Sequence, residues 1–197
     1  MKYLIIVLLW SLYCALHSYL ISAGFTKLMM KLLKNYYAFY RLFYIVISFI
    51  LIVPLFNLSA PAENEIITYS TAFNLIRLIF MYGSIVMFAW AFFFDYDALS
   101  FFGIRQIIGF WKAKSSSQAS EIKKRGLLGV IRHPMYLALI IFLWSRIFTM
   151  TDLLVNSVLT LYVIIGTKLE ERKLVLEFGN NYLKYQQEVP MLIPFTK

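Results

Sequence analysis

The chain has 197 residues, of which 61% are hydrophobic and only 15% are charged. A soluble domain of this size cannot bury so much apolar surface, so the composition excludes a soluble globular protein and predicts a polytopic membrane protein. The formal net charge of +9 is explained by basic loops on one side of a membrane, so it does not argue for nucleic acid, and the single cysteine, Cys14, excludes a disulfide, zinc cluster or redox pair within one chain.

Residues 1–95 are predicted to hold three membrane spans, at residues 3–22, 37–56 and 75–94. A bilayer core of about 30 Å needs roughly 20 helical residues, and each stretch has that length. The first stretch is longer than the roughly 7–15 apolar residues of a signal-peptide core, so it is predicted to be a retained span. Residues 23–36, between the first two spans, are predicted to form a short basic loop.

Two polar side chains in these spans are candidate substrate contacts. A polar group at membrane depth is costly and generally faces protein or a cavity, so His17 is expected to make an interhelical hydrogen bond or to contact a substrate. Arg41 lies in an aromatic cluster at the start of the second span. It is expected to reach the headgroups or to stack on a tyrosine, with ligand binding as the alternative.

Residues 96–125 are the longest polar segment, and residues 96–133 are predicted to be a cytoplasmic loop. Within it, residues 101–111 are apolar enough to lie on the membrane surface as an amphipathic piece. The loop ends at Arg132 and His133, directly before Pro134, a residue that favours the first turn of a helix. A helix start offers unpaired N–H groups to an anionic or electron-rich ligand, and Tyr136 can return to the face of His133.

Residues 134–167 are predicted to form a tight antiparallel hairpin of two short spans, 134–148 and 153–167. Residues 168–188 alternate charged and apolar side chains, which predicts an amphipathic helix that leaves the membrane and bends near Gly179. Two prolines predict that the tail after residue 188 is extended. The hairpin brings Arg132 and His133 close to the Glu170–Glu171 pair, which predicts a polar pocket. The alternative is that the acidic pair only forms an ion pair with Arg132 or Lys168 and closes the hairpin.

The distribution of lysine and arginine orients the spans. The segments 23–36 and 96–133 and the C-terminal tail are basic, whereas residues 57–73 contain two glutamates and no lysine or arginine. The basic segments share one side only if the N-terminus is outside and the C-terminus is cytoplasmic. The predicted fold is therefore an all-α integral membrane protein: one membrane domain over residues 1–197, with about five transmembrane helices and a C-terminal amphipathic helix.

Two motif blocks in the C-terminal half carry a family resemblance. They read Arg-His-Pro-x-Tyr at 132–136, then Glu-Glu-x-x-Leu at 170–174, Phe-Gly-x-x-Tyr-x-x-Tyr at 178–185 and a closing Val-Pro and Pro at 189–194. In this order and spacing they resemble the isoprenylcysteine carboxyl methyltransferase and phospholipid methyltransferase superfamily of integral membrane enzymes. The N-terminal stretches ALHSYLIS, YRLFY and FFGIRQ are similar to the branch that contains NnrU-like proteins and thiol S-methyltransferases.

The resemblance implies that S-adenosylmethionine binds in a cytoplasmic pocket made by the last two spans, the loop before them and the C-terminal helix. By motif position, the residues expected at this cofactor are Ile122, Lys123, Leu128, His133, Pro134, Tyr136 and Glu170. Arg132 and Glu171 are candidate catalytic residues, and His17, Arg41 and Lys168 are candidate substrate contacts. No metal is expected. A basic pocket with Arg132 and Lys168 would favour deprotonation of a thiol acceptor.

One position departs from the prenylcysteine enzymes. These carry an arginine for the substrate carboxylate four residues before the first acid of the pair, where this chain has Gly166. The resemblance therefore favours a small or lipophilic thiol as acceptor. The alternatives are methylation of a prenylcysteine carboxyl or a lipid amine, an NADPH-dependent enzyme like the sterol reductases, and a non-catalytic NnrU-like membrane protein.

Overall fold

Most of the residues that the structure describes are helical. The computed structural model describes residues 1–59, 70–112, 124–146 and 149–196, and no strand occurs in these ranges. Their α-helices are α1 (Lys2–Ile21), α2 (Ala23–Leu33), α3 (Tyr40–Ser59), α4 (Thr71–Trp90), α5 (Ala98–Phe101), α6 (Ile104–Trp111), α7 (Pro134–Trp144), α8 (Met150–Phe178) and α9 (Asn180–Glu188). Three short turns complete the set: η1 (Lys34–Phe39), η2 (Ala91–Asp95) and η3 (Gly126–Gly129). The predicted all-α fold class is confirmed.

Four helical stretches in the described ranges are long and apolar enough to cross a membrane. They are Lys2–Ile21, Ala23–Ser59, Thr71–Asp95 and Met150–Phe178, and they identify a multi-pass membrane protein. Helix α7 is also apolar but has only 11 residues. Such a helix rises about 16 Å, roughly half of a bilayer core. The predicted span at 134–148 thus corresponds to a helix that ends at Trp144, and five crossings, like their direction, stay a prediction.

The prediction of a loop at residues 23–36 is wrong. Residues 23–33 form α2, whose first turn is capped by the Ser22 hydroxyl, which accepts from the Phe25 N–H at 3.3 Å. Lys27 and Lys31 are one helical turn apart, as are Leu28 and Leu32, so the segment has the period of an amphipathic helix. The lysines therefore mark one side of a helix and not a loop.

The chain divides into two compact units, unit 1 with residues 1–63 and 97–119 and unit 2 with residues 64–96 and 120–197. In unit 1, α1 pairs with α3 through interhelical hydrogen bonds. The Trp10 indole N–H donates to the Ser59 hydroxyl at 2.9 Å, and the Tyr40 hydroxyl donates to the Leu20 carbonyl at 2.6 Å. The single-domain arrangement stays a prediction.

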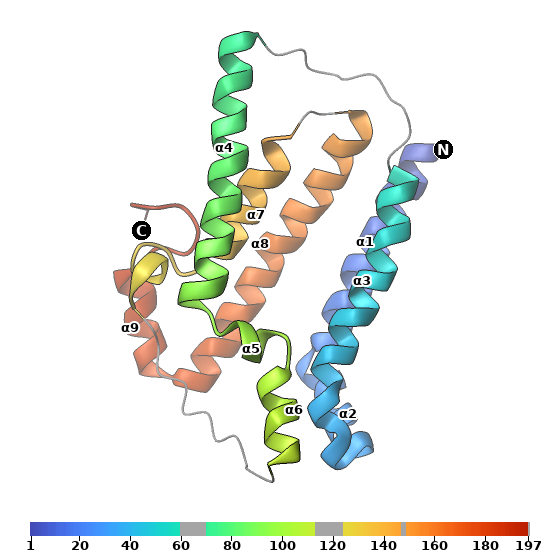
Figure 1. Cartoon of the computed structure of the whole chain (residues 1–197), viewed down its shortest axis with the longest axis vertical. Coiled ribbons are helices and arrows are strands. Elements are labelled where there is room, and N and C mark those ends of the chain that lie inside the picture. The colour runs from blue at the N-terminus through green and yellow to red at the C-terminus, as the bar shows by residue number, and fades with distance from the viewer. Residues whose placement is uncertain (60–69, 113–123, 147–148, 197) are drawn as a thin grey trace. The chain divides into compact units, whose positions relative to one another are not determined.

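Unit 2 contains the hairpin of α7 and α8, with α4 beside α7 (Figure 1). Helix α7 begins at Pro134, whose missing N–H costs nothing at a helix start. Helix α8 begins with a capping box, in which Thr149 and Asp152 bond each other's backbone N–H groups. The Asn156 side chain donates to the Leu143 carbonyl at 2.9 Å, and the Trp144 indole N–H donates to the Thr160 hydroxyl at 2.8 Å. These bonds fix the hairpin in the antiparallel arrangement that the sequence predicts.

The C-terminal part of the chain follows the predicted bend. Helix α8 ends at Phe178, Gly179 adopts φ +57°, and α9 continues from Asn180. Positive φ is accessible to glycine at little cost, so Gly179 allows the change of direction. The tail is extended at Val189, as predicted, but it turns further on, where the Thr196 N–H donates to the Ile193 carbonyl at 3.4 Å.

Candidate functional site

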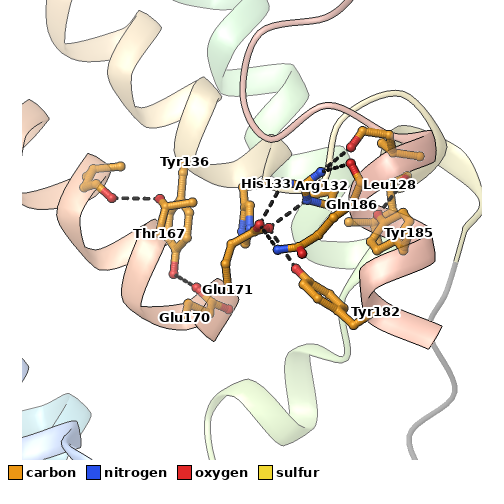
Figure 2. Close-up of polar contacts among 12 residues, drawn as sticks. Leu128, Arg132, His133, Tyr136, Thr167, Glu170, Glu171, Tyr182, Tyr185 and Gln186 are labelled. Carbon is orange, nitrogen blue, oxygen red and sulfur yellow. Dashed lines mark hydrogen bonds and ion pairs between the residues drawn. The ribbon is translucent and has the colours of Figure 1, made fainter. Parts of the chain in front are cut away.

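The Glu171 carboxylate is the centre of a buried polar cluster in unit 2 (Figure 2). Arg132 binds it with two parallel hydrogen bonds, from Nε to Oε1 and from Nη2 to Oε2, both at 2.7 Å. His133 Nε2 lies 2.8 Å from Oε1, Tyr182 donates its hydroxyl to Oε1 at 2.9 Å, and Gln186 Nε2 donates to Oε2 at 2.6 Å. Five donors from two segments of the chain, residues 132–133 and α9, therefore converge on one carboxylate.

Burial makes this cluster strong. Glu171 is 6% exposed, Arg132 8% and His133 2%. Water is largely excluded, so a charge without a partner would be costly there. Within the described part of the chain, the only fully buried side-chain N or O atom without a partner is Gln106 Oε1, which lies outside the cluster. The bidentate ion pair and its neighbours are thus fully hydrogen-bonded.

The same arginine holds the C-terminal tail. Arg132 Nη1 donates to the Gln186 carbonyl at 3.0 Å and also to the Val189 carbonyl. The backbone N–H groups of Arg132 and His133 donate to the carbonyls of Pro190 and Met191, at 2.9 and 3.1 Å. The Arg-His-Pro motif and the Val-Pro motif are therefore two sides of one contact, which explains why both occur in the same chain.

Two tyrosines of α9 complete the cluster. Tyr182 binds Glu171, and the Tyr185 hydroxyl donates to the Leu128 carbonyl at 2.5 Å. Burial raises the pKa of Tyr185 to about 12, and burial, together with the hydrogen bond to Glu171, raises the pKa of Tyr182. Both phenols therefore stay protonated near neutral pH and act as hydrogen-bond donors.

The neighbouring acid, Glu170, has a different environment. Its Oε2 accepts the Tyr136 hydroxyl at 2.7 Å, and Figure 2 shows this pair apart from the Glu171 cluster. Successive residues of a helix point about 100° apart, so the two acids of α8 address different surroundings. Glu170 is only partly buried, and no cation pairs with it among the described residues. Of the two acids, it alone can accept a cationic or hydroxyl-bearing ligand without losing an existing ion pair.

Further groups around Glu170 come from the residue after η2, Tyr96, and from the start of α7. The rings of His133 and Tyr136 are stacked, with centroids 5.5 Å apart and planes at 15°. Burial raises the pKa of Tyr96, and the charge of Glu170 contributes to the same shift, so this phenol also stays protonated near the carboxylate. A carboxylate bordered by phenols and a histidine ring offers both charge and hydrogen bonds to a polar ligand.

The loop before Arg132 is fixed to the end of α4. Asp95 is buried, and its Oδ2 accepts the Leu127 N–H at 3.2 Å. Gly126 adopts φ +62°, and a Cβ at this position would collide with the Asp95 carboxylate. Glycine is required here for both its conformation and its lack of a side chain. The loop that presents Leu128 thus depends on Gly126.

Replacement of Gly126 by alanine is expected to cost about 1–3 kcal/mol, because the new Cβ requires a strained backbone and displaces Asp95. The melting temperature of the purified protein in detergent should fall by several degrees. Gly83→Ala is the matched control in the same unit: Gly83 lies inside α4, and a Cβ there meets nothing within 4 Å. This control should be neutral or slightly stabilising. Equal melting temperatures for the two variants would contradict the assigned role of Gly126.

The structure brings together seven of the residues singled out from the sequence in one region of unit 2. They are Leu128, Arg132, His133, Tyr136, Glu170 and Glu171, which Figure 2 labels, and Pro134, the first residue of α7. Ile122 and Lys123 lie outside the described residues. Lys168 is exposed and lies about 200° around α8 from Glu170, so the two do not share a face.

His17 and Arg41 belong to unit 1. His17 Nδ1 is 3.1 Å from the Ser48 hydroxyl, and the imidazole also bonds the Tyr44 hydroxyl, so His17 makes the interhelical hydrogen bonds expected of it. Arg41 Nε donates to the Phe101 carbonyl at 2.9 Å, and its guanidinium lies over the Phe101 ring. The expected ring contact is thus with a phenylalanine instead of a tyrosine. Neither contact tests a role in substrate binding.

The sequence-based prediction missed Tyr96, Asp95, Tyr182 and Gln186 as members of this region. Tyr182 and Gln186 are four residues apart on α9 and share a face, so the helical period was a usable signal once Glu171 was taken as the centre. Asp95 and Tyr96 follow a long apolar stretch without any motif, and no sequence signal marks them. No group of three metal-binding side chains occurs in the part of the chain that the structure describes.

Comparison of the sequence with known proteins places the chain in a family. Residues 3–189 match the model of the family described as "Protein of unknown function (DUF1295)". A methanethiol S-methyltransferase of Pseudomonas sp. strain GM41 is 29% identical over 195 residues, which cover 97% of this chain and 73% of that protein. Methanethiol S-methyltransferase 2 of Bradyrhizobium diazoefficiens is 29% identical over 194 residues, with the same coverage. No solved structure is significantly similar to the chain.

A third relative matches more closely over a shorter range. The methanethiol S-methyltransferase of Crocosphaera subtropica is 35% identical over 95 residues, which are 48% of this chain and 37% of that protein.

Proposed function

The chain belongs to the DUF1295 family, and from this membership we propose that it is a membrane methyltransferase that uses S-adenosylmethionine and methylates a small or lipophilic thiol. One observation carries the proposal: two proteins named methanethiol S-methyltransferase align with 97% of the chain. The alignment therefore includes the helices that carry the polar cluster and Glu170, and the likeness is not confined to apolar spans, which match easily by composition alone.

The residues present suit the methyl donor. S-adenosylmethionine carries an ammonium group and ribose hydroxyls, and both bind well to a carboxylate. Glu170 is such a carboxylate: it is partly buried, held by the Tyr136 hydroxyl and not paired with a cation among the described residues. The His133 ring is stacked on Tyr136, the partner of Glu170, and so borders the same region. When bound, the donor supplies a methyl group on a positively charged sulfur.

In this proposal Glu171 and Arg132 support the site and do not touch the reacting atoms. Their side chains are buried and form a bidentate ion pair. His133, Tyr182 and Gln186 occupy the remaining acceptor positions of the Glu171 carboxylate. If a ligand drew either charge out of this buried pair, the other charge would be left unpaired, and the resulting loss of stability would exceed the free energy of one ligand contact. The pair instead joins the start of α7, the middle of α8 and the C-terminal tail, and so orients His133 and Glu170.

A neutral acceptor fits the chain better than a carboxylate. Gly166 lies one helical turn before Glu170 on α8, so this position of the helix has no cationic side chain to offer a carboxylate. Methyl transfer to sulfur depends mainly on positioning and on exclusion of water. The apolar sequence of α7 favours that exclusion. The site is further proposed to face the cytoplasm, on the side where the basic segments gather.

A methyl-transfer assay tests the proposal. The purified full-length protein in nanodiscs is given S-adenosylmethionine labelled in the methyl group, together with methanethiol, a longer alkyl thiol, a prenylcysteine analogue or a lipid amine. Transfer of label to the thiols, in excess over protein-free nanodiscs, is the expected result. Transfer to the carboxyl or amine acceptor alone would overturn the choice of acceptor, and no transfer to any acceptor would overturn the enzymatic proposal.

A further inference from the structure

Unit 1 carries a basic surface that the proposed function does not use. It is formed by α2, η1 and α6, which lie side by side in this unit, and we name it the basic face. Its cations are Lys27, Lys31, Lys34, Arg105 and Lys112, and all five are exposed. We propose that the basic face binds the headgroups of anionic phospholipids. This inference is independent of the methyltransferase proposal.

Helix α2 has the side-chain arrangement of a helix at a membrane surface. At about 100° per residue, Lys27 and Lys31 form one ridge, and Leu28 and Leu32 form the stripe next to it. The two leucines are 47% and 65% exposed, so the described residues leave much of their surface uncovered. Apolar side chains of this kind gain from burial between acyl chains, while the adjacent ammonium groups reach the phosphate level.

Helix α6 repeats the arrangement. Arg105 and Lys112 point to nearly the same side, and next to them lie the exposed side chains of Ile104, Ile108 and Trp111. Trp111 is 75% exposed, and tryptophan prefers the interface between headgroups and acyl chains. Two helices of the same unit therefore present cations beside an uncovered apolar stripe.

Aromatic packing joins α6 to the η1 turn that follows α2. The Phe110 ring lies 5.9 Å from Tyr36 and 5.4 Å from Phe39, measured between centroids. The side of α6 that carries Phe110 thus packs against η1. The other side, with Arg105 and Lys112, is exposed and can contact lipid. The basic face is consequently one surface, built from residues 27–34 and 104–112.

The charge of unit 1 selects an anionic partner. Among its described residues, the acid is Asp97, which is paired with Arg105 at 2.6 Å. The cations among the described residues of this unit are Lys2, Lys27, Lys31, Lys34, Arg41, Arg105 and Lys112. Lys27, Lys31, Lys34 and Lys112 have no carboxylate to pair with in the described part of this unit. A zwitterionic headgroup does not compensate this excess, whereas an anionic phospholipid does, and it also supplies acyl chains for the exposed leucines and Trp111.

Quenching of tryptophan fluorescence by brominated lipids tests the proposal. The full-length protein is placed in nanodiscs with equal mole fractions of phosphatidylcholine and phosphatidylglycerol, with only one of the two brominated. Brominated phosphatidylglycerol is expected to quench Trp111 with roughly five-fold higher apparent affinity than brominated phosphatidylcholine. This ratio corresponds to about 1 kcal/mol, the attraction of one lysine or arginine to an anionic lipid surface. Trp111→Phe identifies the signal of this tryptophan. The preference should fall as salt rises.

Charge-removing variants locate the surface. Lys27→Gln/Lys31→Gln/Lys112→Gln should bring the ratio of the two affinities close to one, at an unchanged melting temperature. The matched control, Arg172→Gln/Lys173→Gln/Lys184→Gln, removes three exposed charges from unit 2 and should keep the preference. Inorganic phosphate, added as a probe for a simple phosphate site, should not abolish it. Equal quenching by both lipids in the wild type, equal loss in both triple variants, or full competition by phosphate would each overturn the proposal.

Discussion

Replacement of Glu171 by alanine is expected to destabilise the protein by about 3–5 kcal/mol, the cost of leaving a buried charge without its partner. The substitution removes both hydrogen bonds of the bidentate ion pair and leaves the Arg132 guanidinium, 8% exposed, without a carboxylate. Tyr182, Gln186 and His133 lose their acceptor as well. The total stability of a domain is about 5–15 kcal/mol, so a large fall in melting temperature, or poor expression, should result.

Two further variants separate the ion pair from its surroundings. Glu177→Ala, an exposed position on the same helix, should melt with the wild type. The double variant Arg132→Met/Glu171→Leu should be less destabilised than the sum of its single changes, because it leaves no unpaired charge. If Glu171→Ala melted together with Glu177→Ala, the cluster would not hold unit 2 together.

Replacement of Glu170 by alanine is expected to weaken donor binding by about 1.4–3 kcal/mol, or roughly 10- to 150-fold in affinity, as loss of a charge-assisted hydrogen bond predicts. The melting temperature should change little, because Glu170 is partly exposed and its one partner in the described residues is the Tyr136 hydroxyl. Titration of S-adenosylhomocysteine into the variant by calorimetry measures the loss.

The same titration on two other variants provides the controls. Tyr136→Phe removes the phenol that orients Glu170 and should cost about 0.5–1.5 kcal/mol, the value of a neutral hydrogen bond. Glu177→Gln should bind with wild-type affinity. Unchanged affinity in Glu170→Ala, with the protein folded, would remove Glu170 from the proposed site.

Much of the fold follows from hydrophobic length. The three N-terminal spans predicted at 3–22, 37–56 and 75–94 correspond to α1, α3 and α4 to within four residues at each end, because long apolar runs have few alternatives in a bilayer. The loop predicted at residues 23–36 is wrong because three lysines in a short segment suit a loop and one side of a helix equally, and here residues 23–33 form α2. Helix α7 ends at Trp144, where the Asn156 side chain of α8 donates to the Leu143 carbonyl. The hydropathy averaged along a stretch of sequence does not report such contacts between helices.

The candidate site was predictable only in part. Helical hairpin geometry was sufficient to bring Arg132 and His133 to the Glu170–Glu171 pair. Which acid pairs with Arg132 depends on how α8 is rotated about its axis. Neighbouring residues of a helix point about 100° apart, so Glu170 and Glu171 face different directions. Sequence spacing therefore could not decide that Glu171 pairs with Arg132 while Glu170 accepts only the Tyr136 hydroxyl among the described residues. The predicted resemblance to a thiol S-methyltransferase branch is confirmed by the family match and by relatives that align along nearly the whole chain.

The most direct test of the proposed function is calorimetric titration of the detergent-purified protein with S-adenosylhomocysteine and, in parallel, with NADPH. Micromolar binding of S-adenosylhomocysteine and none of NADPH is the predicted result, because the open carboxylate of Glu170 suits an ammonium and a ribose and repels a phosphate. Binding of NADPH alone would contradict the methyltransferase proposal and favour a reductase. Binding of neither ligand to the folded protein would contradict any role for Glu170 in holding a methyl donor.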